Sequence, residues 1–143
     1  SKEALIHRLQ EEQIPLEKAK LLAFLTNSLG KAVEISQDEW FNDAKDLIYQ
    51  WFVYLQKQDT QAFIYVQKKL VKSFKEKTQQ FTGLSVLMFY YQEAQRQAVA
   101  NGEYGKVKQI NQIIERILIA EQKLRSNVSF QAVAEQFVLH TIF

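Results

Sequence analysis

Cysteine is absent from this 143-residue sequence, and the residues that turn a chain sharply are rare, with four glycines and one proline. The absence of cysteine excludes disulfides, thiolate metal sites and a cysteine nucleophile, and it is typical of a reducing compartment. A β-rich fold of this length needs many tight turns, for which glycine and proline are the main residues. Their scarcity favours long helices joined by short loops.

Long apolar runs and a strong charge of one sign are also missing. No run approaches the ~20 apolar residues that span a bilayer, and charged residues interrupt every apolar patch near the N-terminus, unlike a signal peptide. We therefore expect no membrane partner. The formal net charge of +2 is too small to predict a nucleic-acid partner by itself. Because an amphipathic pattern begins at once in residues 4–9, we interpret the chain as a fragment of a longer one.

Apolar residues recur at spacings of three and four, which predicts an all-α fold. The clearest boundary, Ser36 to Asp38, separates two predicted domains, residues 1–36 and 37–143. Three short helices are expected in the first domain and a bundle of five longer helices in the second. The predicted helices cover residues 3–12, 15–27, 28–35, 38–56, 59–77, 78–101, 103–125 and 129–143.

Several single residues have predicted structural roles. Ser28, Ser36 and Ser129 stand at expected helix starts, where capping explains them better than nucleophilic catalysis does. Gly102 and Asn127 stand at expected helix ends, where a left-handed backbone is common. Leu118 and Leu139 are predicted to face inward in the last two helices.

Motifs for catalysis or metal binding are absent. No glycine-rich run precedes a Lys-Ser or Lys-Thr pair, which excludes a P-loop. His7 and His140 lie at opposite ends of the sequence and cannot fill the four-ligand shell of a structural zinc site. Acidic clusters such as Asp43 with Asp46 lack the Glu-x-x-His pairs of a di-iron bundle, so we interpret them as solvated. We predict no catalytic residue, no metal and no cofactor, and we do not expect an enzyme.

A basic cluster lies near the end of the predicted helix 59–77. Lys68, Lys72 and Lys75 follow spacings of four and three, which places them on one helix face. Cations near a helix C-terminus are favoured by its dipole. The same face is also suited to phosphates or to an acidic partner, although no arginine is present for bidentate phosphate contacts. The cluster comprises Lys68, Lys69, Lys72, Lys75 and Lys77.

Two segments carry the resemblance to a known family. Residues 120–131, AEQKLRSNVSFQ, resemble the end of bacterial clamp-loader subunits of the AAA+ family, where a long helix ends in a K-L-x-x-N-V-N/S-x-Q type of turn. Residues 19–35, AKLLAFLTNSLGKAVEI, look like the end of an AAA+ helical lid. ATP-binding relatives read G-S-x-R-D-A-L there, but Gly30 stands at the position of the nucleotide-sensing arginine and Lys31 follows it. This departure favours a resemblance to the delta-prime subunits of DNA polymerase III, which do not hydrolyse ATP.

The resemblance implies a remnant of a three-helix lid in residues 1–36 and a collar domain in residues 37–143. In such assemblies the collar domains of five subunits form a ring that holds the AAA+ modules, which open a sliding clamp and place it on primed DNA. The implied partners are the tau/gamma and delta subunits of the DNA polymerase III holoenzyme in the bacterial cytoplasm, with DNA contacted only indirectly or weakly. In isolation from these subunits, the fragment could instead associate with copies of itself.

Interface anchors are expected among large apolar side chains. Phe89 to Tyr91 extend the apolar surface of their helix beyond one stripe, and a helix of that kind is buried by more than one neighbour. In a small bundle part of that surface faces another subunit. The predicted anchors are Phe89, Tyr90, Phe137 and Phe143.

One alternative function stays open. A stand-alone helical module could bind DNA through the basic face from Lys68 to Lys77. This alternative predicts an affinity for DNA that falls as the salt concentration rises, because phosphate contacts release counterions.

Overall fold

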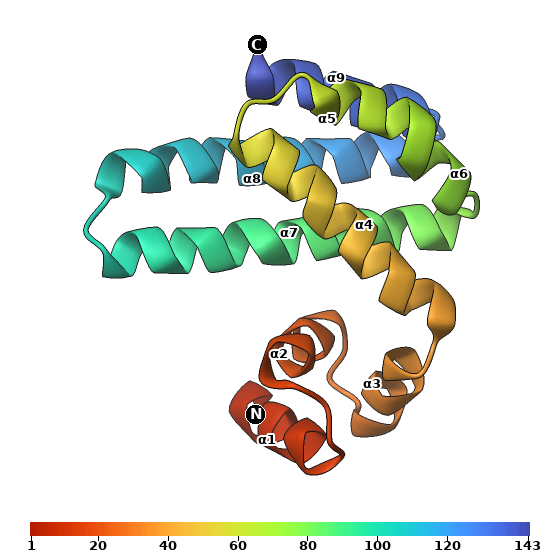
Figure 1. Ribbon diagram of the computed structural model, residues 1–143, viewed down its shortest axis with the longest axis vertical. Coiled ribbons are helices and arrows are strands. Elements are labelled where there is room, and N and C mark those ends of the chain that lie inside the picture. Colours follow the sequence, from red (N-terminus) through yellow and green to blue (C-terminus); the bar gives the residue numbers. More distant parts are fainter. The chain divides into compact units, whose positions relative to one another are not determined.

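Helices are the only regular elements of the computed structural model, which describes residues 1–143 (Figure 1). The predicted all-α fold, three short helices followed by five longer helical segments, is confirmed. The short helices are α1 (Lys2–Glu11), α2 (Leu16–Leu25) and α3 (Leu29–Ser36). The longer segments are α4 (Glu39–Gln56), α5 with η1 and α6 (Gln61–Tyr65, Val66–Leu70 and Val71–Ser73), α7 (Lys77–Ala100), α8 (Tyr104–Arg125) and α9 (Phe130–Ile142).

Two compact units, Ser1–Lys45 and Asp46–Phe143, divide the chain inside α4. In the first unit, α1, α2 and α3 contact one another around fully buried Leu9, Leu22 and Ala32. The end of α3 is held by the carbonyl of Ser36, which accepts hydrogen bonds from Lys18 Nζ at 2.9 Å and Asn42 Nδ2 at 3.1 Å. These bonds satisfy a carbonyl that has no partner within its own helix.

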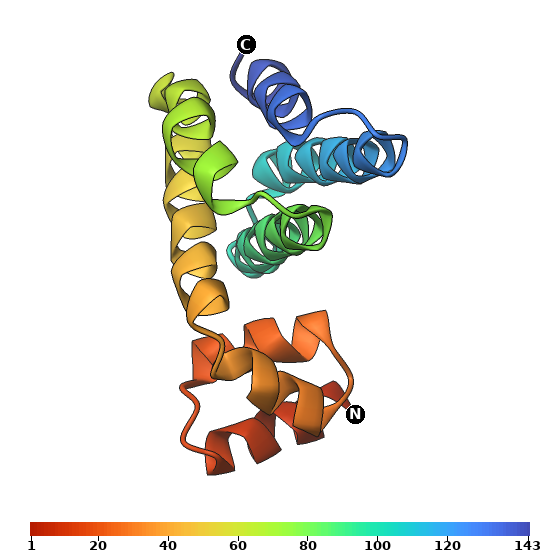
Figure 2. The ribbon, with the colours of Figure 1, turned by 90° about the vertical axis from the view of Figure 1, so that its right-hand side faces the viewer.

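The second unit is built on an antiparallel hairpin of α7 and α8. Figure 2 shows α7, α8 and α9 stacked in one layer, with the later part of α4 and the α5–α6 segment on one side of it. Trp51 of α4 is fully buried where these layers meet. Its Nε1 donates to the carbonyl of Ala62 at 3.1 Å, and its ring lies 5.8 Å from that of Phe137 in α9. Trp51 therefore ties α4, α5 and α9 together.

The segment from Gln61 to Ser73 differs from the regular α-helix that we predicted, because Val66–Leu70 form a π turn. Its buried residues Ala62, Val66 and Leu70, together with Phe74 directly after it, are spaced by four throughout. In a regular α-helix, with ~100° per residue, each step of four overshoots one turn by ~40°, so three steps would drift by ~120°. A π turn holds more residues than an α turn. It reverses this drift and keeps all four side chains on one side.

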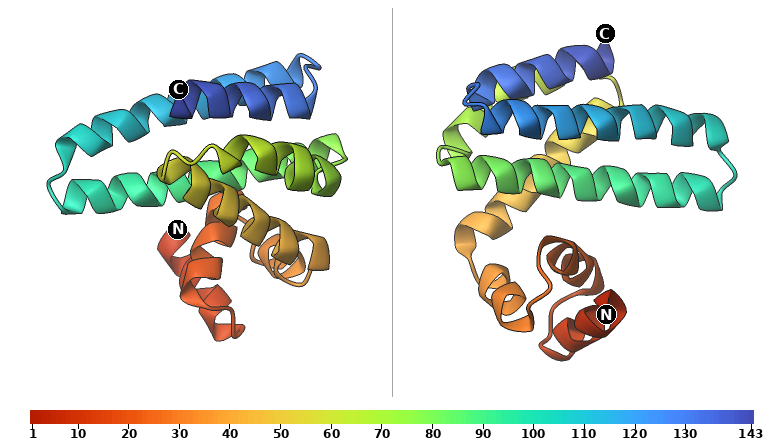
Figure 3. Two further views of the ribbon diagram at one scale, coloured as in Figure 1. Left: turned by 45° about the horizontal axis from the view of Figure 1, so that its top comes forward. Right: turned by 180° about the vertical axis from the view of Figure 1, so that it is seen from behind.

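The joints between helices confirm several predictions. Gly102 and Asn127 have positive φ angles of 70° and 67°, and Figure 3 shows from behind the short connection of α7 to α8 that contains Gly102. The hydroxyls of Ser28 and Ser129 cap α3 and α9 by accepting from backbone amides three residues on, at 3.1 and 3.2 Å. The prediction for Ser36 is wrong. It is the last residue of α3, and its hydroxyl donates back to the carbonyl of Val33.

Gly83 lies inside α7 at a point where no larger residue fits. A Cβ atom there would stand 2.9 Å from Cε1 of the buried Phe74 ring. Alanine has a helix propensity ~1 kcal/mol better than glycine, but overpacking costs about 1–3 kcal/mol. We expect Gly83→Ala to lower the free energy of unfolding, measured by urea denaturation. Gly105→Ala in α8, where no atom lies within 4 Å of the added Cβ, is the matched control and should leave stability unchanged or raise it. A stabilised Gly83→Ala variant would contradict the packing argument.

Two tyrosines, the half-buried Tyr65 and the buried Tyr91, provide a paired test of hydrogen bonding. The Tyr65 hydroxyl donates to the carbonyl of Leu47 at 2.8 Å, and its burial beside Tyr54 raises its pKa to about 12. The Tyr91 hydroxyl is buried without a hydrogen-bond partner, and burial raises its pKa as well. Removing a paired hydroxyl costs ~1 kcal/mol, whereas removing an unpaired one relieves a desolvation penalty. We expect Tyr65→Phe to lower the thermal midpoint and Tyr91→Phe to leave it unchanged or raise it. Equal losses in both variants would refute this assignment.

Candidate subunit interface

No constellation for metal binding is formed anywhere in the chain. No group of three or more His, Asp and Glu side chains comes together to hold an ion. His7 lies in the first compact unit and His140 in the second. None of the helices has the length and apolar character needed to cross a membrane. The exposed surfaces of the helices are therefore the candidate functional sites.

The lysine cluster does not lie on one face of a single regular α-helix, although we predicted that it would. Lys68 and Lys69 lie in the π turn, Lys72 lies in α6, and Lys75 follows the end of that helix at Ser73. All four side chains are exposed, and none forms a salt bridge. Lys77, the first residue of α7, donates to Asn127 Oδ1. The chain turns at Lys75 because Gln79 Oε1 accepts from the amides of Lys75 and Glu76, at 3.1 and 2.9 Å.

The four predicted interface anchors lie in different surroundings. Phe89 and Phe137 are buried among this chain's own helices, and Tyr90 is half-buried. Phe143, at the end of α9, is 78% exposed. Of the four, Phe143 is the one with most of its side chain accessible to another protein.

Tyr90 belongs to a cluster of aromatic rings between α4 and α7. Its ring lies 5.2 Å from that of Tyr49 and 5.7 Å from that of Phe52, and Phe52 in turn contacts Tyr91 edge to face at 4.8 Å. Burial raises the pKa of Tyr90, with smaller contributions from Asp46 and Tyr49. The apolar surface that Phe89 to Tyr91 add to α7 is thus largely covered within the chain itself.

Large apolar side chains are nevertheless exposed elsewhere, chiefly on α8 and α9. Leu118 and Leu139, which we predicted to face inward, are 50% and 47% exposed. The inward prediction for both is wrong, because Ile117 and Val138 occupy the buried stripe beside them. Tyr104 at the start of α8 is 71% exposed. The exposed set of the second unit comprises Tyr49, Ile64, Val99, Tyr104, Leu118, Ile119, Val128, Leu139 and Phe143.

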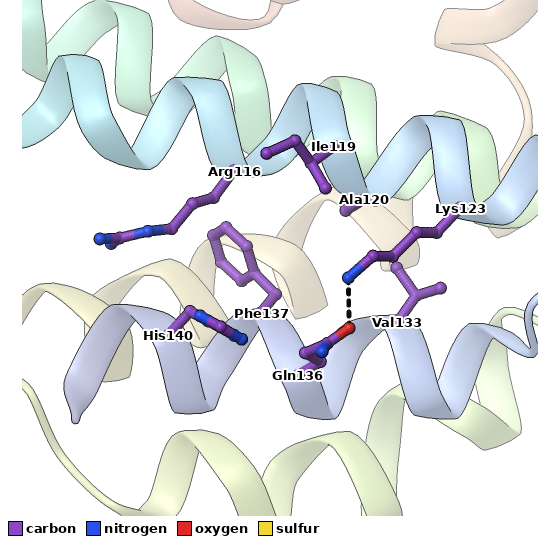
Figure 4. A pocket seen from close by; sticks show the side chains of 8 residues that line it. All are labelled: Arg116, Ile119, Ala120, Lys123, Val133, Gln136, Phe137 and His140. Carbon is purple, nitrogen blue, oxygen red and sulfur yellow. Dashed lines mark hydrogen bonds between the residues drawn. The ribbon is translucent and has the colours of Figure 1, made fainter.

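A groove of about 210 Å³ lies between α8 and α9 (Figure 4). Ala120, Val133 and Phe137 form its apolar floor. Its rims carry Arg116, Ile119 and Lys123 from α8 and Gln136 and His140 from α9.

The rims of the groove are basic and contain no acidic residue. Arg116 and Lys123 are half-buried, and Figure 4 shows them on either side of the Phe137 ring. Lys123 Nζ donates to Gln136 Oε1 across the groove, and neither cation forms a salt bridge. An ammonium group has three N–H donors and a guanidinium has five, so both cations keep donors for a ligand. The arrangement suits an apolar group flanked by negative charge.

Sequence reasoning missed this groove, although it named Phe137 and His140 separately. One signal was present in the run Ile117-Leu118-Ile119-Ala120. This run is too wide for a single buried stripe and so requires exposed apolar side chains. The meeting of α8 with α9 is not visible in either helix alone.

Comparisons with known proteins give one similar relative. The chain is 29% identical over 153 aligned residues to DNA polymerase III subunit delta' of Bacillus subtilis (strain 168), and the match covers 95% of this chain. The chain spans 46% of the length of that relative. The resemblance predicted from the two segments is confirmed. No protein-family model and no solved structure matches the chain.

Proposed function

We propose that this chain is the assembly domain of a clamp-loader subunit of the delta-prime type. The observation that supports the proposal most strongly is the similarity to DNA polymerase III subunit delta', because it extends over 95% of the chain. The chain would then act by position in the loading of a sliding clamp onto DNA, in the bacterial cytoplasm. It would be part of the loader and not of the polymerase active site, and it would hydrolyse no ATP.

In this proposal residues 1–36 are the lid and residues 37–143 the collar domain. The collar would pack against the tau/gamma and delta subunits. Exposed aromatic and aliphatic side chains on long helices support an interface of this kind, since large apolar side chains form the core of protein interfaces. Tyr104 and Leu118 of α8 are the exposed anchors that we assign to it, with Phe143, which directly follows α9. Long rigid helices such as α7 and α8 are suited to transmit movement between neighbours.

The proposal predicts stable association with a tau/gamma collar. We expect this chain to co-elute in gel filtration with the C-terminal domain of a tau/gamma subunit. Leu118→Ser should weaken that association at least tenfold, or ~1.4 kcal/mol, because truncating an interface anchor removes buried apolar area. Gln122→Ser, one turn further along α8 and also exposed, is the matched control. Failure of the unchanged chain to co-elute would contradict the proposed role.

A second candidate function is supported by the exposed lysines without salt bridges. Lys68, Lys69, Lys72 and Lys75 offer four cations to DNA phosphates. For this alternative we expect an affinity for duplex DNA that falls with salt, and a slope that decreases by about one for each removed contact. The variant Lys68→Glu/Lys72→Glu/Lys75→Glu should abolish binding, whereas Lys106→Glu/Lys108→Glu on α8 should not. A DNA affinity that is independent of salt would eliminate this alternative.

A further inference from the structure

The α8–α9 groove combines features that the proposed assembly role does not by itself require. Its floor is apolar and its rims carry two cations without carboxylate partners. We propose that this groove binds an acidic amphipathic helix of another protein. The helix would place one apolar side chain on Phe137 and one carboxylate on each of Arg116 and Lys123. The inference stands on the groove alone and holds for any partner that presents this pattern.

The volume of the groove argues for a side-chain anchor. Pockets for drug-sized ligands and cofactors measure ~300–1,000 Å³, whereas this groove measures about 210 Å³. It is too small for a nucleotide and lacks the glycine-rich backbone that cradles phosphates. A leucine or phenylalanine side chain is of a size that the floor of Ala120, Val133 and Phe137 can accept.

The shape of the floor is stable before any partner arrives. Phe137 is 4% exposed, and its ring packs against the fully buried ring of Trp51, with 5.8 Å between the ring centroids. Val133 and Ala120 are buried as well. Because these side chains are held by the core, the groove does not need to form during binding, which avoids an ordering cost.

The charges of the rim select carboxylates. The guanidinium of Arg116 matches the two oxygens of a carboxylate, and Lys123 keeps donors beyond the one used for Gln136. His140, exposed on the α9 rim, adds a third nitrogen-bearing side chain. A purely apolar partner would leave these half-buried cations without compensation, which disfavours it.

The elements that form the groove indicate a helical occupant. An extended peptide gains affinity by pairing with an open sheet edge, and α8 and α9 offer none, because their backbone groups are paired within the helices. Arg116 and Lys123 are seven residues apart on α8, or ~10.5 Å along its axis. A partner helix that lies along the groove spans the same distance between two acids seven residues apart. The expected pattern is therefore an acidic residue, an apolar residue three or four positions after it, and a second acidic residue seven positions after the first.

An exposed apolar residue also borders the groove. Ile119 stands on the α8 rim and is 48% exposed. The occupant can thus cover Ile119 with a further apolar residue beside its central anchor.

A synthetic peptide provides the test. The probe is an acetylated and amidated helical peptide of 18 residues with one Glu-x-x-Leu-x-x-x-Glu pattern in a neutral alanine and glutamine background. We expect it to shift the backbone amide signals of Ile119, Lys123, Gln136 and His140 in an NMR titration of this chain. A peptide in which both acids are Gln should bind at least tenfold more weakly.

Variants of the chain locate the site. Arg116→Ser/Lys123→Ser should weaken peptide binding at least tenfold, and Lys106→Ser/Lys108→Ser on the same helix should leave it unchanged. Ile119→Ser, at an exposed position, should weaken binding without loss of fold, which circular dichroism verifies. The proposal is refuted if the Gln peptide binds equally well, if the shifts lie outside the groove, or if an oligothymidine probe displaces the peptide through Arg116 and Lys123. The assay uses no clamp-loader subunit, so its failure is separable from a failure to co-elute with tau/gamma.

Discussion

The contact of Phe74 with Gly83 determines how the second compact unit is arranged. The Phe74 ring occupies the space that a side chain at position 83 of α7 would need, and it lies 5.9 Å from the ring of Phe130 at the start of α9. The chain leaves helical geometry at Phe74, and Gln80 Nε2 donates to its carbonyl at 3.0 Å. Phe74 thus lies at the end of α6 and contacts both α7 and the start of α9. The packing of α7 and of the start of α9 against the α5–α6 segment therefore meets at the Phe74 ring.

Much of the fold could be predicted because helices obey local rules. Spacings of three and four identified every long helix, and the residue types at Gly102 and Asn127 indicated their left-handed joints. The π turn could not be predicted in this way. It results from the need of Ala62, Val66, Leu70 and Phe74 to share one side, which depends on the helices packed against them. The role of Ser36 could not be predicted either. A serine hydroxyl can accept from an amide at a helix start or donate back to a carbonyl in the last turn, and Ser36 does the latter.

The candidate site was less accessible to sequence reasoning. Periodicity indicates which side of a helix is apolar, but it does not say which neighbour covers that side. Periodicity therefore predicts Phe89 and Phe137 as interface anchors, although the chain itself buries them, and it predicts Leu118 as a core residue, although Leu118 is exposed. The basic rim of the α8–α9 groove combines residues from two helices. In the sequence, nothing distinguishes Arg116 and Lys123 from other surface cations. They form part of a candidate site because α9 packs Phe137 between them.

The π turn also affects how this chain should be aligned with its relatives. A π turn holds one residue more than the α turn that a regular helix would have there, so the buried positions on both sides of it stay on one side of the helix. Gln67, Lys68 and Lys69 are the exposed residues of that turn. An alignment with a relative whose helix is regular should therefore open a one-residue gap among these three positions. A gap moved to the loop after Ser73 would pair Leu70 with a residue of the wrong face.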